Sequence, residues 1–288
     1  MSKLKKYAAT ITGYFKHQNN HAAALAYYSL FALIPIAFVS FSLFGRIFGQ
    51  ETIEQIIIRF LTNQVGLKDT TSIVEFFTNT QFTKPNIWME ILSILAIIVT
   101  TSAMTSSVKR GVNDTLDVPI KKRTRVDLVK DVIQFRLFSI LAIALFMFFM
   151  IVLYFSQLFL ISMLEMWFSE ESFLFQAAIS VISLGLSFIS YFSIFFCIYN
   201  YGHDGDIETK IVVGASLFST MVVCLSQFAI KYYLQHFFVF KDAGLTGAFL
   251  VILTWIYFTS HILFMGAFYL KREKKQINAA KIIVKNEK

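Results

Sequence analysis

A stripe of polar side chains between residues 211 and 237 is the strongest candidate for chemistry in this sequence. Its members recur every three or four residues and are Ser216, Thr220, Cys224, Gln227, Lys231 and Gln235. At about 100° per residue, this spacing keeps them within one sector of a helix. Polar groups are costly in lipid, so the sector should face protein or water. Two interpretations stay open: hydrogen bonds within a packed bundle, or the wall of a polar cavity.

The polar groups become larger toward the C-terminal end of this stripe, which favours the cavity. Large polar groups are harder to satisfy in a dry bundle, and a basic side chain there could attract an anionic headgroup. Glu90, on an earlier apolar segment, could instead neutralise Lys231 as an ion-pair partner. The residues expected to line such a cavity are Ser216, Thr220, Gln227, Lys231 and Gln235.

A second polar face lies between residues 245 and 270, where Thr254, Tyr257 and His261 share one side of a helix. An isolated histidine in a membrane segment is expected to be a packed hydrogen-bonding residue more often than a proton relay. The loop from Gly202 to Asp206 contains one histidine and two carboxylates, but no second group of ligands accompanies it. A solvated turn is therefore favoured over a metal site.

Catalytic motifs are absent from the sequence. There is no phosphate-binding glycine loop, no nucleophile elbow, no paired-histidine zinc motif and no repeated His and Asp ligands of a metal-dependent nuclease. We therefore expect a protein that is not an enzyme and that uses no cofactor or metal.

The composition indicates that these residues lie in an all-α, polytopic integral membrane protein. Hydrophobic residues make up 56% of the chain, Phe occurs 33 times, and the mean hydropathy is +0.63. Such values do not fit a surface that faces water. Six apolar runs are long enough to cross a bilayer as helices. The six predicted transmembrane helices span residues 22–44, 87–108, 135–164, 173–199, 211–237 and 245–270.

Amphipathic and basic segments flank these spans. Residues 1–21 and the first outer loop, 46–86, carry apolar residues at helical spacing and are expected to form interfacial helices. Residues 271–288 form a basic tail, and the loop from Lys109 to Arg136 is also strongly basic. Short loops rich in Lys and Arg stay in the cytoplasm, so we expect both termini to be cytoplasmic.

This orientation places all but six of the 26 basic residues on the cytoplasmic side. The cations cluster in segments that would face an anionic leaflet, so the partners expected are the lipid bilayer and anionic headgroups rather than nucleic acid. The six exceptions are Arg46, Arg59, Lys68, Lys84, Lys231 and Lys241.

The sequence also resembles the YihY/virulence factor BrkB-like family, once labelled ribonuclease BN. The resemblance lies in the run from Ala22 to Leu30 with Leu33-Ile34-Pro35, the hydroxyl-rich residues before Val112-Asn113-Asp114, Val213-Gly214-Ala215, Gly244 to Tyr257, and Gly266-Ala267. It implies a six-helix protein of the bacterial cytoplasmic membrane with no securely established activity. Two positions depart from the family pattern: Phe268 stands where an acidic residue is common, and the Gly202 to Asp206 turn where a proline is common.

The function expected is non-enzymatic handling or transport of a lipid or another amphipathic solute. A membrane scaffold without transport activity is the alternative, and a ribonuclease is less favoured because no catalytic set accompanies the old label.

Overall fold

The computed structural model describes residues 10–15, 21–39, 45–62, 70–73, 75, 87–118, 151–152, 154–164, 166, 173–236 and 244–286. Within these ranges 93% of the residues are helical and none forms a strand, as the sequence predicts. The labelled helices are α2 (His21–Val39), α3 (Gly45–Phe48), α4 (Gln50–Phe60), α6 (Ile87–Thr115), α8 (Phe173–Tyr201), α9 (Thr209–His236) and α10 (Gly244–Asn286).

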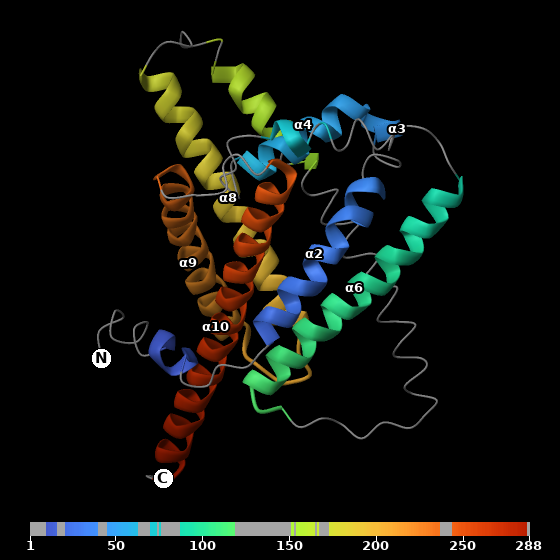
Figure 1. Cartoon of the computed structure of the whole chain (residues 1–288). Coiled ribbons are helices and arrows are strands. Elements are labelled where there is room, and N and C mark those ends of the chain that lie inside the picture. Colours follow the sequence, from blue (N-terminus) through green and yellow to red (C-terminus); the bar gives the residue numbers. More distant parts are fainter. Residues whose placement is uncertain are drawn as a thin grey trace.

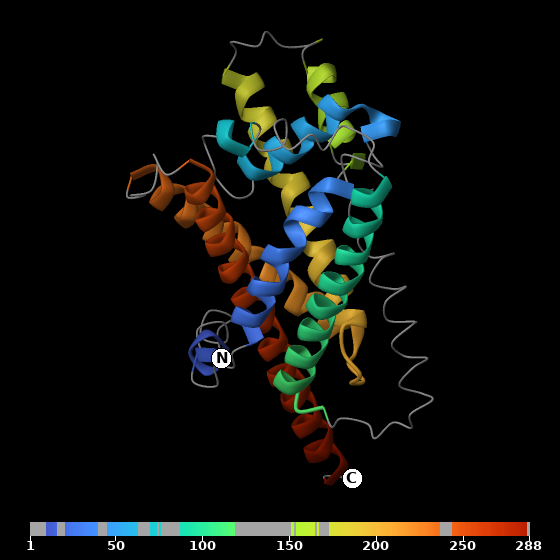
Figure 2. The same cartoon turned by 45° about the vertical axis from the view of Figure 1, so that its right-hand side comes forward.

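The long helices form a bundle whose two ends carry different segments (Figure 1). One end, called the turn end below, holds the 202–208 turn, the start of α2, the end of α6 and the helical residues 10–15. At the opposite end, called the α4 end, the short helix α4 lies across the bundle (Figure 2). The segments predicted to be cytoplasmic and described here therefore share one end of the molecule.

Helix α10 is the element shared by two helix pairs. Helix α2 packs along α6, and α8 packs along α9, while α10 contacts α9, α2 and α6. The largest apolar cluster joins these helices and includes Val112, Tyr199 and Leu270, none of which has exposed surface. Its members lie mostly toward the turn end.

Two glycines allow the helices of this cluster to approach closely. A Cβ atom on Gly266 would overlap the side chains of Tyr199 and Ser219, and one on Gly111 would overlap the ring of Phe264. Because only glycine leaves this space, aromatic rings from neighbouring helices fill it. This explains why glycine occurs within helices despite its lower helix propensity.

Within the described residues, four helices are long and apolar enough to cross a membrane: Ile91–Thr115 within α6, Phe173–Tyr201, Thr209–Ile230 within α9, and Thr246–Ile277 within α10. They correspond to the second, fourth, fifth and sixth predicted spans. Two shorter apolar helices, His21–Leu33 and Tyr154–Leu164, fall within the first and third predicted spans. Residues 40–44 and 135–150 of those two predictions lie outside the described residues, so six spans stay a prediction.

Two helices extend beyond the predicted spans, whose own boundaries in the membrane stay a prediction. Helix α6 continues beyond residue 108 to Thr115, and α10 continues beyond residue 270 to Asn286, through what was expected to be a separate tail. Apolar length marks only the part of a helix that suits lipid. Lys, Arg, Glu and Gln are good helix formers, and no Gly or Pro interrupts residues 271–286, so the backbone stays helical.

Both segments expected to be amphipathic have a buried face. In α4, Ile53 and Ile56 pack against Ile151 and Tyr154, and the Tyr154 hydroxyl donates a hydrogen bond to Gln55 Oε1 at 2.8 Å. In the N-terminal segment, the described residues Thr10 and Tyr14 are buried. The apolar faces of these helices thus contact protein, and their placement on a membrane surface stays a prediction.

Candidate functional site

The small polar residues of the predicted stripe on α9 are buried and bonded to their own helix. Ser216 and Thr220 have no exposed surface. The Ser216 hydroxyl donates to the carbonyl of Val212 at 2.8 Å, and the Thr220 hydroxyl donates to the carbonyl of Ser216 at 2.7 Å. These intrahelical bonds satisfy the hydroxyl protons without help from a neighbouring helix.

Gln227 reaches a neighbouring helix. Its Nε2 atom donates to the hydroxyl of Tyr191 on α8 at 2.6 Å, and only 8% of Gln227 is exposed. An amide inside a membrane bundle needs such a partner, because an unsatisfied polar group is costly there. The stripe therefore joins α9 to α8 at this level.

One turn of α8 before the 202–208 turn, Tyr199 forms a second interhelical contact. Its hydroxyl donates to the backbone carbonyl of Leu263 on α10 at 2.8 Å, and its oxygen lies 2.8 Å from Ser219 Oγ on α9. Because Tyr199 gives its single proton to Leu263, the Ser219 hydroxyl can donate to Tyr199. The three helices are thus joined by one buried hydroxyl network.

The opposite face of α9 is apolar and exposed, as expected for a surface that meets lipid. The residues on this face are Leu217, Met221, Leu225, Phe228 and Tyr232. The side chains of Lys231, Gln235 and Glu90 lie outside the described part of the chain. A water-filled cavity along the stripe therefore stays a prediction, and the described members of the stripe are packed.

The second predicted polar face, on α10, has a hydrogen-bonding partner in the N-terminal segment. Tyr14 is 4% exposed, and its hydroxyl lies 2.8 Å from His261 Nδ1 on α10. The ring of Tyr257 packs edge-on against His261 at 4.5 Å, whereas Thr254 is exposed and donates to the carbonyl of Leu250. Burial, and then the proximity of Tyr257, raises the pKa of Tyr14 to about 12. His261 is therefore held in a packed hydrogen bond.

Phe268 packs against the same N-terminal segment. Its ring lies against Gly13, where an added Cβ atom would approach the ring to 2.8 Å. Phe268 is also packed against the largest apolar cluster. An aromatic residue at this position, in place of the acidic residue common in the family, therefore provides an apolar contact for the segment.

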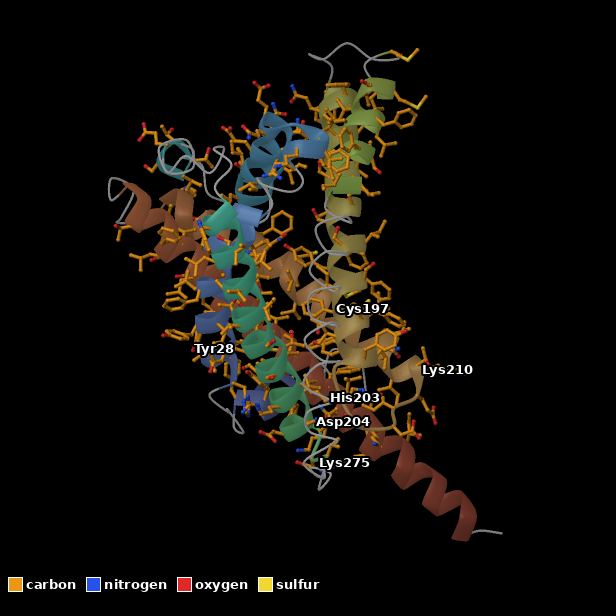
Figure 3. All side chains as sticks on the ribbon, turned by 90° about the vertical axis from the view of Figure 1, so that its right-hand side faces the viewer. Tyr28, Cys197, His203, Asp204, Lys210 and Lys275 are labelled. Carbon is orange, nitrogen blue, oxygen red and sulfur yellow. The ribbon has the colours of Figure 1, made fainter. Side chains whose placement is uncertain are left out.

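The turn after α8 is attached to the end of α6 through Asp204. Lys109 Nζ lies 2.8 Å from Asp204 Oδ1, and Asn113 Nδ2 donates to Asp204 Oδ2 at 3.1 Å. The backbone N–H of Asp204 donates back to Asn113 Oδ1 at 3.0 Å. Figure 3 shows Asp204 and His203 on the side of the turn near α6, with Lys210 on the far side. The sequence analysis favoured a solvated turn for this loop. In the structure, the turn also contacts the end of α6.

His203 in the same turn accepts a hydrogen bond at Nδ1 from the backbone N–H of Gly205 at 3.1 Å. Burial lowers the pKa of His203 below its usual 6.5, and the nearby charge of Lys274 lowers it further, although the backbone bonds and Asp204 oppose this shift. Neutral imidazole is therefore favoured in the folded turn.

Helix α6 ends in a left-handed turn that binds α10. The N–H of Val118 donates to the carbonyl of Asn113 at 3.0 Å, and Asp117 has a φ of 55°. Glycine is the usual residue at such a position. Asp117 instead places its carboxylate 2.9 Å from Lys271 Nζ and 3.5 Å from Lys275 Nζ. The hydrogen bond from Lys271 is the largest cause that lowers the pKa of Asp117.

The start of α2 is attached to the same end of α6. His21 Nε2 lies 3.0 Å from Asp114 Oδ2. The last turns of α6 therefore contact α2, α10 and the turn between α8 and α9 through polar side chains. The segment Val112-Asn113-Asp114, on which part of the family resemblance rests, lies at the centre of these contacts.

Sequence reasoning did not identify the partners Tyr14, Tyr191, Tyr199 and Ser219. The tyrosines within apolar runs were one usable signal for such hydrogen bonds, since a buried hydroxyl needs a partner. Periodicity can place a residue on one face of a helix, but it does not say which distant helix that face meets.

Comparison with known proteins places the chain by family alone. Neither the curated proteins nor the solved structures include a match. The family model described as virulence factor BrkB matches residues 12–279, and the chain therefore belongs to the virulence factor BrkB family.

Proposed function

We propose that this membrane protein moves or exposes a lipid or another amphipathic solute, without catalysing a reaction. The observation that carries the proposal is the buried pair of Gln227 and Tyr191, which lies inside apolar helices. Polar side chains within a membrane are costly, and they often mark the path of a polar group. Ser216, Ser219 and Thr220 extend the same polar interior along α9 toward the turn end.

The amphipathic class of substrate follows from the two faces of α9. One face is apolar and exposed, with Leu225 and Phe228 outward, while the other holds Gln227. A lipid could keep its acyl chains against the first face while its headgroup follows the second. Lys231, if its side chain faces the same path, would attract an anionic headgroup and could alternatively pair with Glu90.

A scaffold is the second candidate, and the packing of the polar stripe favours it. Ser216 and Thr220 are satisfied within α9, and Gln227 has its partner on α8, so these bonds could serve assembly alone. A scaffold would transport nothing and would retain a stable protein partner during purification. The old ribonuclease label is a third candidate, which we favour least.

The deciding experiment uses purified protein in vesicles of phosphatidylethanolamine and phosphatidylglycerol. Movement of a fluorescent phospholipid between leaflets and flux of amphipathic solutes are measured, together with cleavage of RNA. Replacing Gln227→Leu and Tyr191→Phe together removes both polar partners and leaves neither unpaired, so the fold should persist. We expect lipid movement above that of empty vesicles and a loss of about fivefold in the double variant, since one hydrogen bond contributes about 1 kcal/mol.

Ser226→Ala is the matched control, because it also removes a polar group from α9, but the Ser226 hydroxyl donates to the carbonyl of Val222 on its own helix. It should transport like the parent protein. Vesicles with no lipid or solute movement would refute the proposed function. RNA cleavage that survives stringent purification and disappears in a His203→Ala, Asp204→Ala variant would reverse the ranking in favour of the ribonuclease.

We also propose that the protein lies in the bacterial cytoplasmic membrane with the turn end in the cytoplasm. The support is the shared position of the basic segments at this end and the cytoplasmic preference of Lys and Arg. Reporter fusions and single-cysteine labelling test it. Labelling of a cysteine at position 122 from outside the cell would contradict this orientation.

A further inference from the structure

The described helices form two pairs that share one neighbour. The most extensive contacts among the described helices are those between α2 and α6 and between α8 and α9, and α10 contacts members of both pairs. Among the described helices, α6 has no contact of comparable extent with α8 or α9. Relative motion of the two pairs would therefore disturb fewer helix–helix contacts than separation within a pair.

Helix α6 contacts the turn between α8 and α9 through a polar cluster formed by Lys109, Asn113 and Asp204. One residue of the turn, Asp204, forms an ion pair with Lys109, accepts a hydrogen bond from Asn113 Nδ2 and donates its backbone N–H to Asn113 Oδ1. The contact continues beside it, because an added Cβ atom on Gly205 would lie 3.0 Å from Val118. The turn is thus attached to α6 mainly through polar groups.

This polar contact is accessible to water and therefore easy to release. The side chains of Lys109 and Asp204 are each 30% exposed. Water screens such a pair, so losing it changes a population by about fivefold at most. In contrast, α6 remains attached to α10 through the buried ring of Phe264, which packs directly against Gly111. Release at Asp204 would leave α10 as the shared axis.

Buried residues lie behind this contact. Val112 on α6 and Tyr199 on α8 have no exposed surface, and Ser216 on α9 is also fully buried. Separation of α6 from the turn would bring water toward these positions from the turn end.

We propose that Lys109, Asn113 and Asp204 form a releasable latch that opens the bundle at the turn end by letting α2–α6 move away from α8–α9 about α10. The latch is a conformational device, and its opening is independent of what the protein carries. Its role as the gate for a lipid or amphipathic solute rests on the proposed function.

Opening is measured with a single reporter cysteine. Ser216→Cys is introduced after Cys197→Ser and Cys224→Ser, because Ser216 is buried and bonds only its own helix. Membrane vesicles of both orientations are treated with a charged, membrane-impermeant thiol reagent, and the rate of modification is followed. Adding Asp204→Ala should raise this rate about fivefold in one vesicle orientation, the one that exposes the turn end.

Two further variants make the result specific. Exchanging the charges, with Lys109→Asp and Asp204→Lys together, should lower the rate again toward that of the latched protein. Lys210→Ala is the matched control, since it removes an exposed cation near the turn but not from the latch, and it should leave the rate unchanged. If Asp204→Ala fails to fold, Lys109→Gln removes the ion pair alone and should still raise the rate.

An unchanged rate in folded Asp204→Ala and Lys109→Gln would overturn the latch, as would an equal increase in Lys210→Ala. Lipid movement in the same variants is measured separately. A faster cysteine reaction without any lipid or solute movement would retain the latch and refute the proposed function. Lipid movement with an unchanged cysteine reaction would retain the function and refute the latch.

Discussion

The two ends of the described bundle are held together by different kinds of contact. At the turn end, Val112 and Tyr199 are fully buried, and ion pairs join α6 to the surrounding segments. Toward the α4 end, α6 and α8 carry exposed apolar residues such as Trp88 and Phe173. Buried polar partners and close glycine contacts therefore concentrate where the basic segments meet. The difference indicates that interhelical specificity resides at the turn end, whereas lipid-compatible surface dominates elsewhere.

The largest expected effect comes from filling the space at Gly266. In Gly266→Ala, the new methyl group would overlap Tyr199 and Ser219, which are already joined to each other. Overpacking and loss of this bond should lower the free energy of unfolding by about 3 kcal/mol. Unfolding by denaturant in detergent micelles measures it.

Gly185→Ala is the matched control on α8. Apart from its own helix backbone, no described part of the chain comes within 4 Å of an added Cβ atom at Gly185, so the better helix propensity of alanine should stabilise the helix by up to about 1 kcal/mol. The two glycine changes are thus expected to have opposite signs. Equal effects would contradict the tighter packing assigned to the turn end.

The next effect concerns the paired polar groups of the interior. Gln227→Leu leaves the Tyr191 hydroxyl without its donor and should destabilise the protein by about 1–2 kcal/mol. Adding Tyr191→Phe removes the hydroxyl that accepted the bond from Gln227 and should restore most of that loss. The same unfolding measurement applies, and a double variant less stable than Gln227→Leu would disprove a mutual bond.

The sequence predicts features that depend on neighbouring residues better than contacts between residues far apart in the chain. The apolar runs predicted α8 and α9 within a few residues at each end, because lipid compatibility is a local property of composition. Helices α6 and α10 continue beyond the predicted spans, since charged residues can continue a helix outside the lipid, and the apolar criterion does not predict this continuation.

The site shows the same limit. Ser216, Thr220 and Gln227 are buried in α9, yet their spacing in the sequence gave no means to choose between a cavity and packing. The bonds from Gln227 to Tyr191 and from Lys109 to Asp204 join residues far apart in the chain. A single sequence contains no distance information for such pairs.

A smaller effect is expected at Asp117, where two terms oppose each other. Asp117→Gly relieves the left-handed backbone conformation, which favours glycine by about 1 kcal/mol. The same change removes the exposed contacts with Lys271 and Lys275, which contribute at most about 1 kcal/mol. The net change should be near zero. Asp117→Ala loses the contacts without relieving the backbone, so it should be less stable than Asp117→Gly by about 1 kcal/mol. Unfolding at low salt measures both, and equal stabilities would remove the argument from backbone strain.

The smallest expected effect is a pH dependence of the turn itself. The folded turn lowers the pKa of His203 below its usual 6.5, so the unfolded chain binds a proton more readily than the folded chain. The stability contributed by neutral His203 should be fully present above pH 6.5 and should fall as the pH decreases toward the lowered value. His203→Gln cannot titrate, and its unfolding midpoint should therefore change less between pH 7.5 and pH 5.5, about one unit on either side of the usual histidine value. Asp117 titrates lower, because its pKa is reduced from 3.8 by the hydrogen bond from Lys271. If the parent protein and His203→Gln lose stability in parallel over this interval, the titration belongs to other groups and the turn is insensitive to pH.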